Sequence, residues 1–335
     1  MIRKFVYLSH IAKVFTPKKL INLIKIYSSY YYSLYSRNII HKGNPWSLSI
    51  ETGTFCNLSC LECPSGQKQF HRPTGYLSLE NFKIIIDQQK DYLIWLIMYF
   101  QGEPYMNKDF FDMVSYAKKN NIFTSTSTNA HFLDKENAKK TINSGLDKII
   151  ISLDGTTQES YEKYRIGGDY QSVINGINNL VQTKKELRAS NPYIIVQFIV
   201  FKTNEHQITE IKKLKKELKF DKLEIKTAQI YSSTDNNQLI PKNKAFSRYK
   251  QKDNGKWVVK HSLKNKCKRM WQSAVITWDG NVLPCCFDKD GDYVMGNILK
   301  ESFEDIKRRT NYKEFRNKVF SNRKDIDICR NCTEK

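Results

Sequence analysis

The sequence contains no run of eighteen apolar residues, so it predicts no membrane-spanning helix. Its N-terminus lacks a compact apolar stretch followed by a small-residue cleavage site, which argues against a secretory signal. No repeat or low-complexity tract interrupts the 335 residues, of which 40% are hydrophobic. These absences predict a globular cytoplasmic protein with one large domain, or a large domain and a smaller appendage.

Acidic residues are missing from the first fifty positions, and the whole chain has a net charge of +21. Such a charge raises the question of nucleic-acid binding, but a solvated lysine-rich surface is the interpretation we favour. Residues 1–45 form a basic, aromatic helical segment that allows two interpretations. The segment lies on an anionic membrane surface, or it packs its apolar face against the rest of the protein, which we expect.

Disulfides are not expected, although the chain has eight cysteines. A large chain without an export signal that groups its cysteines at short spacings is typical of thiolate metal ligands in a reducing compartment. The first group is Cys56, Cys60 and Cys63, and the second contains Cys267, Cys285, Cys286, Cys329 and Cys332.

Predicted strands and helices alternate between residues 46 and 231. The strands are expected at 46–51, 93–100, 122–127, 148–153, 193–201 and 222–227. The helices are expected at 79–90, 108–120, 134–144, 170–188 and 205–219, with a short one after a capping box of Thr156 and Glu159 and with Asn204 as the last N-cap. Six strands in this order predict an α/β fold, a partial (β/α)6 TIM-type barrel with right-handed crossovers.

Several polar motifs fall at the carboxyl ends of these strands, where barrels carry their function. They are the first cysteine group, the Gly102-Glu103-Pro104 turn, Ser127-Thr128-Asn129 and Ser152-Leu153-Asp154-Gly155. Their common position predicts one shared site.

The spacing C-x3-C-x2-C indicates the chemistry of that site. Three thiolates do not complete a structural zinc site, whereas a [4Fe–4S] cluster held by three cysteines keeps one iron open. The segment ETGTFCNLSCLECP resembles the signature of radical S-adenosylmethionine (SAM) enzymes. The resemblance implies that Cys56, Cys60 and Cys63 hold the cluster, and that SAM is cleaved to a 5′-deoxyadenosyl radical that abstracts a substrate hydrogen.

The resemblance extends over residues 47–227 and implies contacts to SAM. The turn Gly102-Glu103-Pro104 is similar to the one that meets the methionine amino group, although Gln101 replaces the commoner glycine. Ser152 and Asp154 match a motif near the ribose and carboxylate, Arg165 resembles the arginine that pairs with that carboxylate, and Asn129 is a ribose candidate. A flavodoxin- or ferredoxin-type electron donor is also implied.

The second group resembles a shortened auxiliary-cluster module of the SPASM or Twitch type. The marks are the Gly280-x4-Cys285 element and the closing Cys329-x2-Cys332. The resemblance implies a second [4Fe–4S] cluster held by Cys267, Cys285, Cys329 and Cys332. Cys286 is either a buried apolar residue or a replacement for Cys285, and the spacing favours Cys285.

The predicted domains are therefore the segment 1–45, the barrel 46–231, a linker 232–265 and an iron–sulfur module 266–335. Tyr249 and Lys250 are expected to border the substrate pocket. A fully ligated second cluster favours electron transfer, so we expect a radical SAM oxidoreductase that dehydrogenates a small molecule. The alternatives are a peptide-modifying enzyme, which the short N-terminal segment disfavours, and a non-enzymatic nucleic-acid-binding metalloprotein, which leaves the strand-end motifs unexplained.

Overall fold

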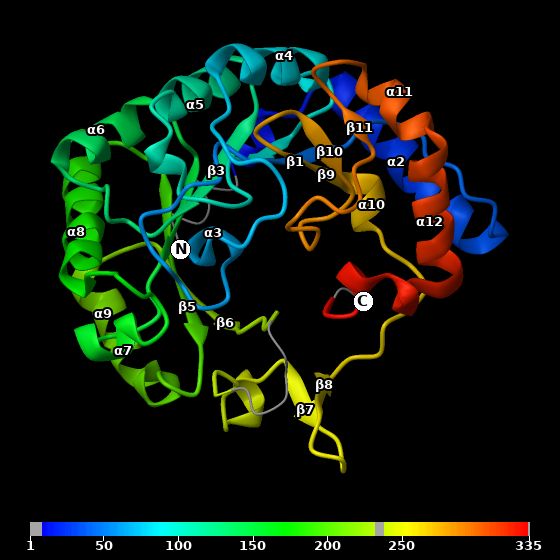
Figure 1. The fold of residues 1–335 in the computed structure, drawn as a ribbon. Coiled ribbons are helices and arrows are strands. Elements are labelled where there is room, and N and C mark those ends of the chain that lie inside the picture. The colour runs from blue at the N-terminus through cyan, green and yellow to red at the C-terminus, as the bar shows by residue number, and fades with distance from the viewer. Residues whose placement is uncertain (1–8, 232–237, 334–335) are drawn as a thin grey trace. The chain divides into compact units, whose positions relative to one another are not determined.

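The computed structural model describes residues 9–231 and 238–333 (Figure 1). These residues form two compact units whose segments alternate along the sequence. The first unit comprises 56–69, 126–231 and 238–261, and the second comprises 9–55, 70–125 and 262–333. No helix in the described ranges is long and apolar enough to cross a membrane.

The first unit is built around three parallel strands. They are β4 (Lys148–Ser152), β5 (Tyr193–Val200) and β6 (Lys222–Thr227), in that order. Helices α6 (Lys135–Asn143), α8 (Tyr170–Glu186) and α9 (Ile208–Leu218) follow one another beside them (Figure 1). The apolar runs of β4 and β5 are buried on both faces, as parallel strands require.

Two predicted helix starts in this unit differ from the structure. Helix α7 (Gln158–Glu162) begins with a capping box of Thr157 and Ser160, one residue later than the expected box. The predicted Asn204 cap is wrong, because its side-chain amide donates to the carbonyls of Asp154 and Ile199 instead. A 3-10 turn, Glu205–Gln207, takes its place before α9.

The described part of the predicted linker has regular structure. Strands β7 (Tyr249–Gln251) and β8 (Trp257–Val259) form an antiparallel hairpin, preceded by a 3-10 turn at Lys244–Phe246. Strands of three residues are too short to show a period in the sequence. Residues 232–237 of the predicted linker lie outside the described residues.

The second unit contains strands β1 (Ser47–Ile50) and β2 (Trp95–Ile97), which are parallel, and β3 (Phe123–Thr128) pairs with β2. Helices α4 (Leu79–Gln89) and α5 (Phe110–Lys119) pack together in the same unit (Figure 1). Strand β2 is shorter than the expected 93–100. The carbonyl of Tyr99 accepts a hydrogen bond from the Ser49 hydroxyl at 2.5 Å instead of a ladder bond.

The C-terminal segment extends this sheet, which the sequence did not predict. Strand β9 (Ser273–Ile276) pairs in parallel with β1, and β10 (Asn281–Leu283) and β11 (Gly296–Asn297) follow as antiparallel neighbours. The helices of this segment are α10 (Arg269–Gln272), α11 (Phe303–Arg308) and α12 (Thr310–Asn322). The N-terminal helix of the unit, α2 (Pro17–Ser36), starts at Thr16, whose hydroxyl accepts from the Lys19 N–H.

Candidate iron–sulfur and SAM site

The first cysteine group lies in the loop between β1 and α3 (Pro64–Gln67). Its three members, Cys56, Cys60 and Cys63, form no disulfide and pack against one hydrophobic cluster of the first unit. Buried members of that cluster include Leu58, Tyr164, Phe201, Ile230 and Tyr249. The thiols therefore have a largely apolar, water-poor wall on one side. Tyr249, expected near the pocket, belongs to this wall, whereas Lys250 is exposed.

Polar side chains approach two of the three sulfurs. The Asn129 amide lies 3.8 Å from the Cys56 sulfur and donates to Asn57 Oδ1 at 2.8 Å. The Arg165 guanidinium lies 3.7 Å from the Cys60 sulfur. Burial raises the pKa of Cys60, and the nearby Arg165 opposes that rise. A cation beside a buried sulfur stabilises the thiolate form that binds iron.

Arg165 is itself held by a buried carboxylate. Its Nε and Nη2 contact Asp154 Oδ2 at 2.7 and 2.6 Å, with the Asp154 side chain fully buried. The other oxygen, Oδ1, accepts the Ile199 N–H at 2.7 Å, and Asn204 donates to the Asp154 carbonyl. Asp154 thus fixes the strand ends of β4 and β5 and orients Arg165 toward the cysteine loop. Ser152, the last residue of β4, is buried two positions earlier.

The Gly-Glu-Pro turn belongs to the second unit and closes on the residues just before Cys56. Gly102 has φ of 72°, and a Cβ there would lie 2.4 Å from the Gly53 carbonyl oxygen. The Glu103 N–H donates to the Phe55 carbonyl at 2.8 Å, and one carboxylate oxygen accepts the Tyr105 N–H at 3.2 Å. Pro104 begins a 3-10 turn, Pro104–Met106. Only glycine fits this close approach without strain.

The first cysteine group supplies three thiol donors. No three His, Cys, Asp or Glu side chains in the part of the chain that the structure describes are grouped to hold one ion. Sulfurs on one tetrahedral metal lie about 3.8 Å apart, because each bond is about 2.3 Å long. A cluster binds each thiolate at a different iron, so it accepts a wider spacing. The three-cysteine donor set, its apolar wall and its nearby arginine fit an iron–sulfur cluster.

Four cysteines of the second group line one cavity in the second unit. They are Cys267, Cys285, Cys329 and Cys332, and Cys286 is not among the lining residues. Arg323, which is almost fully buried, also lines the cavity and donates to the Cys332 sulfur at 3.1 Å. A second guanidinium nitrogen, Nη1, donates to the carbonyls of Lys264 and Lys266.

Cys286 has a different partner. Arg269 donates to its sulfur at 3.1 Å. A hydrogen bond with Cys285 and the charge of Arg269 lower the pKa of Cys286, against the effect of burial. Neither Arg269 nor Arg323 was predicted as a cysteine partner, because neither stands at a motif position.

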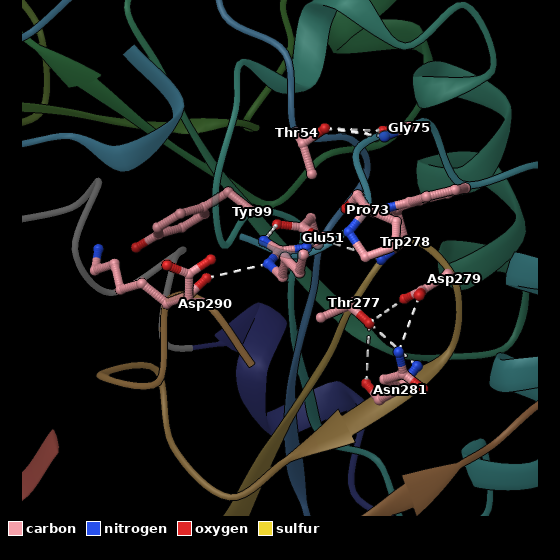
Figure 2. Close-up of polar contacts among 12 residues, drawn as sticks. Glu51, Thr54, Pro73, Gly75, Tyr99, Thr277, Trp278, Asp279, Asn281 and Asp290 are labelled. Carbon is pink, nitrogen blue, oxygen red and sulfur yellow. Dashed lines mark hydrogen bonds and ion pairs between the residues drawn. The ribbon is translucent and has the colours of Figure 1, made fainter. Parts of the chain in front are cut away.

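A buried ion pair links the start of the cysteine loop to the C-terminal module within the second unit. Glu51 follows β1 and accepts two bonds from Arg72, at 2.6 and 2.8 Å. The Trp278 N–H also approaches Glu51, and its indole N–H donates to the Pro73 carbonyl. Figure 2 shows Glu51 beside Trp278, which lies in the turn between β9 and β10 with Thr277 and Asp279. The sequence did not indicate this pair.

Comparison with protein families shows to which family the two cysteine groups and the parallel strands belong. The model of the Radical SAM superfamily matches residues 50–214, and the SPASM iron–sulfur cluster-binding domain matches residues 267–333. Together the two models match more than half of the chain. The chain belongs to the radical SAM superfamily. Family membership confirms the expected cofactors, a [4Fe–4S] cluster with SAM and auxiliary iron–sulfur binding in the C-terminal domain, and it confirms the partial α/β barrel.

Individual relatives of this radical SAM protein match different shares of it. The Fe-coproporphyrin III synthase of Methanosarcina barkeri is 33% identical over 37% of the chain and 31% of its own length. A tungsten-containing aldehyde ferredoxin oxidoreductase cofactor-modifying protein of Pyrococcus furiosus is 25% identical over 80% of the chain and 82% of its own length. The PqqA peptide cyclase of Gluconobacter oxydans is 28% identical over 56% of the chain and 50% of its own length.

The radical SAM protein therefore spans about a third of the first relative and half of the third. Among solved structures, Streptococcus suis SuiB bound to S-adenosylmethionine has a TM-score of 0.63 at 15% identity. The match covers 86% of this chain and 71% of SuiB. At that identity the likeness concerns the fold.

Proposed function

We propose that this radical SAM enzyme dehydrogenates a small molecule and passes the electron left on the substrate to an auxiliary [4Fe–4S] cluster. The observation that carries the proposal is the cavity lined by four cysteines. Four thiolates occupy all four irons of a cubane cluster, which leaves no iron open for substrate. Such a cluster is suited to electron transfer rather than to direct substrate binding.

The proposed ligands of the first cluster are Cys56, Cys60 and Cys63. When bound, that cluster and SAM supply the 5′-deoxyadenosyl radical that abstracts a substrate hydrogen. The chain's own residues hold and shield the site. Arg165 keeps positive charge at the Cys60 sulfur, Asp154 holds Arg165 in place, and the apolar wall excludes water.

The proposed SAM contacts remain Gly102, Glu103 and Pro104 in the turn, with Asn129, Ser152 and Arg165 at the strand ends. For Asp154, which the resemblance placed near the SAM ribose and carboxylate, we propose a different role. Both of its oxygens already accept hydrogen bonds from the protein, so it acts through Arg165 rather than on SAM. A reducing protein of the flavodoxin or ferredoxin type is the proposed electron donor.

For the auxiliary cluster we propose Cys267, Cys285, Cys329 and Cys332 as ligands. Cys286 serves as the matched control, because it neighbours Cys285 but does not line the cavity. The reconstituted protein should bind about eight irons, four for each cluster. The double variant C329A/C332A should hold about half of that iron and still cleave SAM, while C286A should keep all of it. A C286A protein that loses half of its iron would reassign the ligand.

Peptide modification is the second candidate, because one relative is named a peptide cyclase. The two candidates differ in the source of the abstracted hydrogen. Extract from cells grown in deuterated water is separated into a small-molecule and a peptide fraction, and each is incubated with the reconstituted enzyme. Deuterium in 5′-deoxyadenosine from the small-molecule fraction alone supports the proposal, and its appearance from the peptide fraction alone supports the second candidate.

A further inference from the structure

Helix α2 exposes apolar side chains where a surface helix normally exposes polar ones. Six of its residues are between 43% and 82% exposed: Leu20, Ile21, Ile24, Tyr31, Tyr32 and Tyr35. At about 100° per residue they occupy one arc of about 120° around the helix axis. We call these six residues the outward stripe.

The opposite face of α2 is packed, and much of it is polar. Buried Lys19 donates to the Asn121 carbonyl at 2.7 Å, and buried Asn22 exchanges two 2.8 Å bonds with the backbone of Asn44. Ser33 donates to the Ile40 carbonyl. These bonds fix the rotation of the helix about its axis. The outward stripe is therefore held outward, while the apolar Ile26 and Tyr30 of the same helix are packed against the protein.

Positive charge borders one edge of the stripe, and the described residues 9–50 contain no acidic residue. Lys18 and Lys25 flank it on α2, and both line an open pocket shared with α11 and α12. The pocket is also lined by Lys42 and by four cationic residues of the C-terminal helices: Lys307, Arg308, Lys313 and Arg316.

Only two acidic side chains line this pocket among the described residues, and each is already paired. Asp91 pairs with Lys18, and Glu304 pairs with Lys307 and Arg308. Lys25, Lys42 and Lys313 have no acidic partner in the described part of the chain. The pocket consequently has a surplus of positive charge that no acidic side chain of the described residues neutralises. Such a pocket is a candidate site for an anionic group.

We propose that the outward stripe and this pocket dock the protein on a membrane surface that contains anionic phospholipid. Aliphatic and tyrosine side chains enter the interfacial layer, where an apolar body and a polar hydroxyl are both accommodated. The lysines of the pocket take phosphate groups of the lipid heads. An apolar stripe bordered by a pocket with a net positive charge complements this surface, whereas a protein partner would have to supply a matching acidic rim.

The docking test is co-sedimentation of the full-length reconstituted protein with vesicles. One set contains neutral phosphatidylcholine alone, and the other contains thirty per cent phosphatidylglycerol. Binding is expected only with the anionic vesicles and should weaken as salt rises. The variant I24S should lower the partition coefficient about tenfold, because it removes the most exposed aliphatic side chain of the stripe. K25Q and K313Q should each lower it about fivefold.

Matched controls lie on other helices. Ile84 on α4 is 46% exposed, so I84S removes a comparable apolar side chain, and K139Q on α6 removes an exposed lysine. Both should bind as the unaltered protein does. Circular dichroism checks that each variant is folded.

Four results would overturn the proposal. Absence of binding to anionic vesicles at low salt removes the membrane as occupant, and unaltered binding by I24S removes the stripe from the contact. Competition by millimolar inorganic phosphate would make the pocket a site for a soluble anion. If the protein is a dimer in solution and the variant I24S is a monomer, the stripe is an interface between two copies of the chain.

Discussion

Replacing Asp154 by asparagine should destabilise the protein strongly, because it removes one partner of a buried ion pair. The Asp154 side chain is fully buried and that of Arg165 is 14% exposed, so solvent screens the pair little. Breaking such a pair costs about 3–5 kcal/mol, a large part of the 5–15 kcal/mol that typically stabilises a domain. In D154N the amide oxygen still accepts the Ile199 N–H, but the amide nitrogen faces the Arg165 donors.

Urea unfolding of the reconstituted protein, followed by circular dichroism, measures this loss. The double variant D154N/R165Q should be more stable than D154N by more than about 2 kcal/mol, since it removes the unpaired cation as well. E159Q breaks the exposed pair with Lys163 and should leave the urea midpoint unchanged. A loss below about 1 kcal/mol in D154N, with no gain in the double variant, would refute the role assigned to Asp154.

Other predictions concern the turn, the Glu51 pair and a buried acid. G102A should cost more than about 2 kcal/mol in urea unfolding, because Gly102 has positive φ and no room for a Cβ beside Gly53. E51Q should cost about 3–5 kcal/mol by leaving Arg72 unpaired (Figure 2), and a change below 1 kcal/mol would contradict it. Burial raises the pKa of Asp288 from 3.8 to about 6, so its folded state favours the neutral acid. The neutral acid therefore stabilises the folded protein fully below pH 4, and this stabilisation, on the order of 3 kcal/mol, is lost as pH rises through 6. The D288N protein should not show this loss in its free energy of unfolding. If the unaltered protein and D288N lose stability in parallel as pH rises, this prediction is wrong.

The barrel was predictable because its strands have local signals. The run at 148–153 is observed as Lys148–Ser152, and the run at 222–227 is observed with the same bounds. A buried parallel strand such as β4 is a continuous apolar stretch, and β6 alternates apolar and polar residues; a sequence displays both patterns directly. The placement of motifs after these strands followed from the alternation alone.

Long-range partnerships were not predictable in the same way. The pairing of β9 with β1 joins residues more than two hundred positions apart, and no period in either strand encodes its partner. The arginines beside the cysteines are a second example. Arg165 was expected to face the SAM carboxylate, but its contacts with Asp154 and Cys60 depend on how three loops fold together. Arg323 lies in a lysine-rich stretch that resembles solvated surface.

The choice between Cys285 and Cys286 depended on a family spacing, since both residues are equally close to the other cysteines in sequence. The cavity supports Cys285, because Cys286 is absent from its lining and contacts Arg269 instead. Local sequence does not reveal which of two adjacent cysteines lines a cavity.

Production of 5′-deoxyadenosine from SAM tests the central claim most directly. The anaerobically reconstituted protein, given a strong reductant, should release 5′-deoxyadenosine and methionine. A variant with Cys56, Cys60 and Cys63 all changed to alanine should release none, although it keeps about half of the iron on its C-terminal cysteines. Cleavage that persists in this variant, or fails in the fully loaded unaltered protein, would contradict the assignment of the three-cysteine loop.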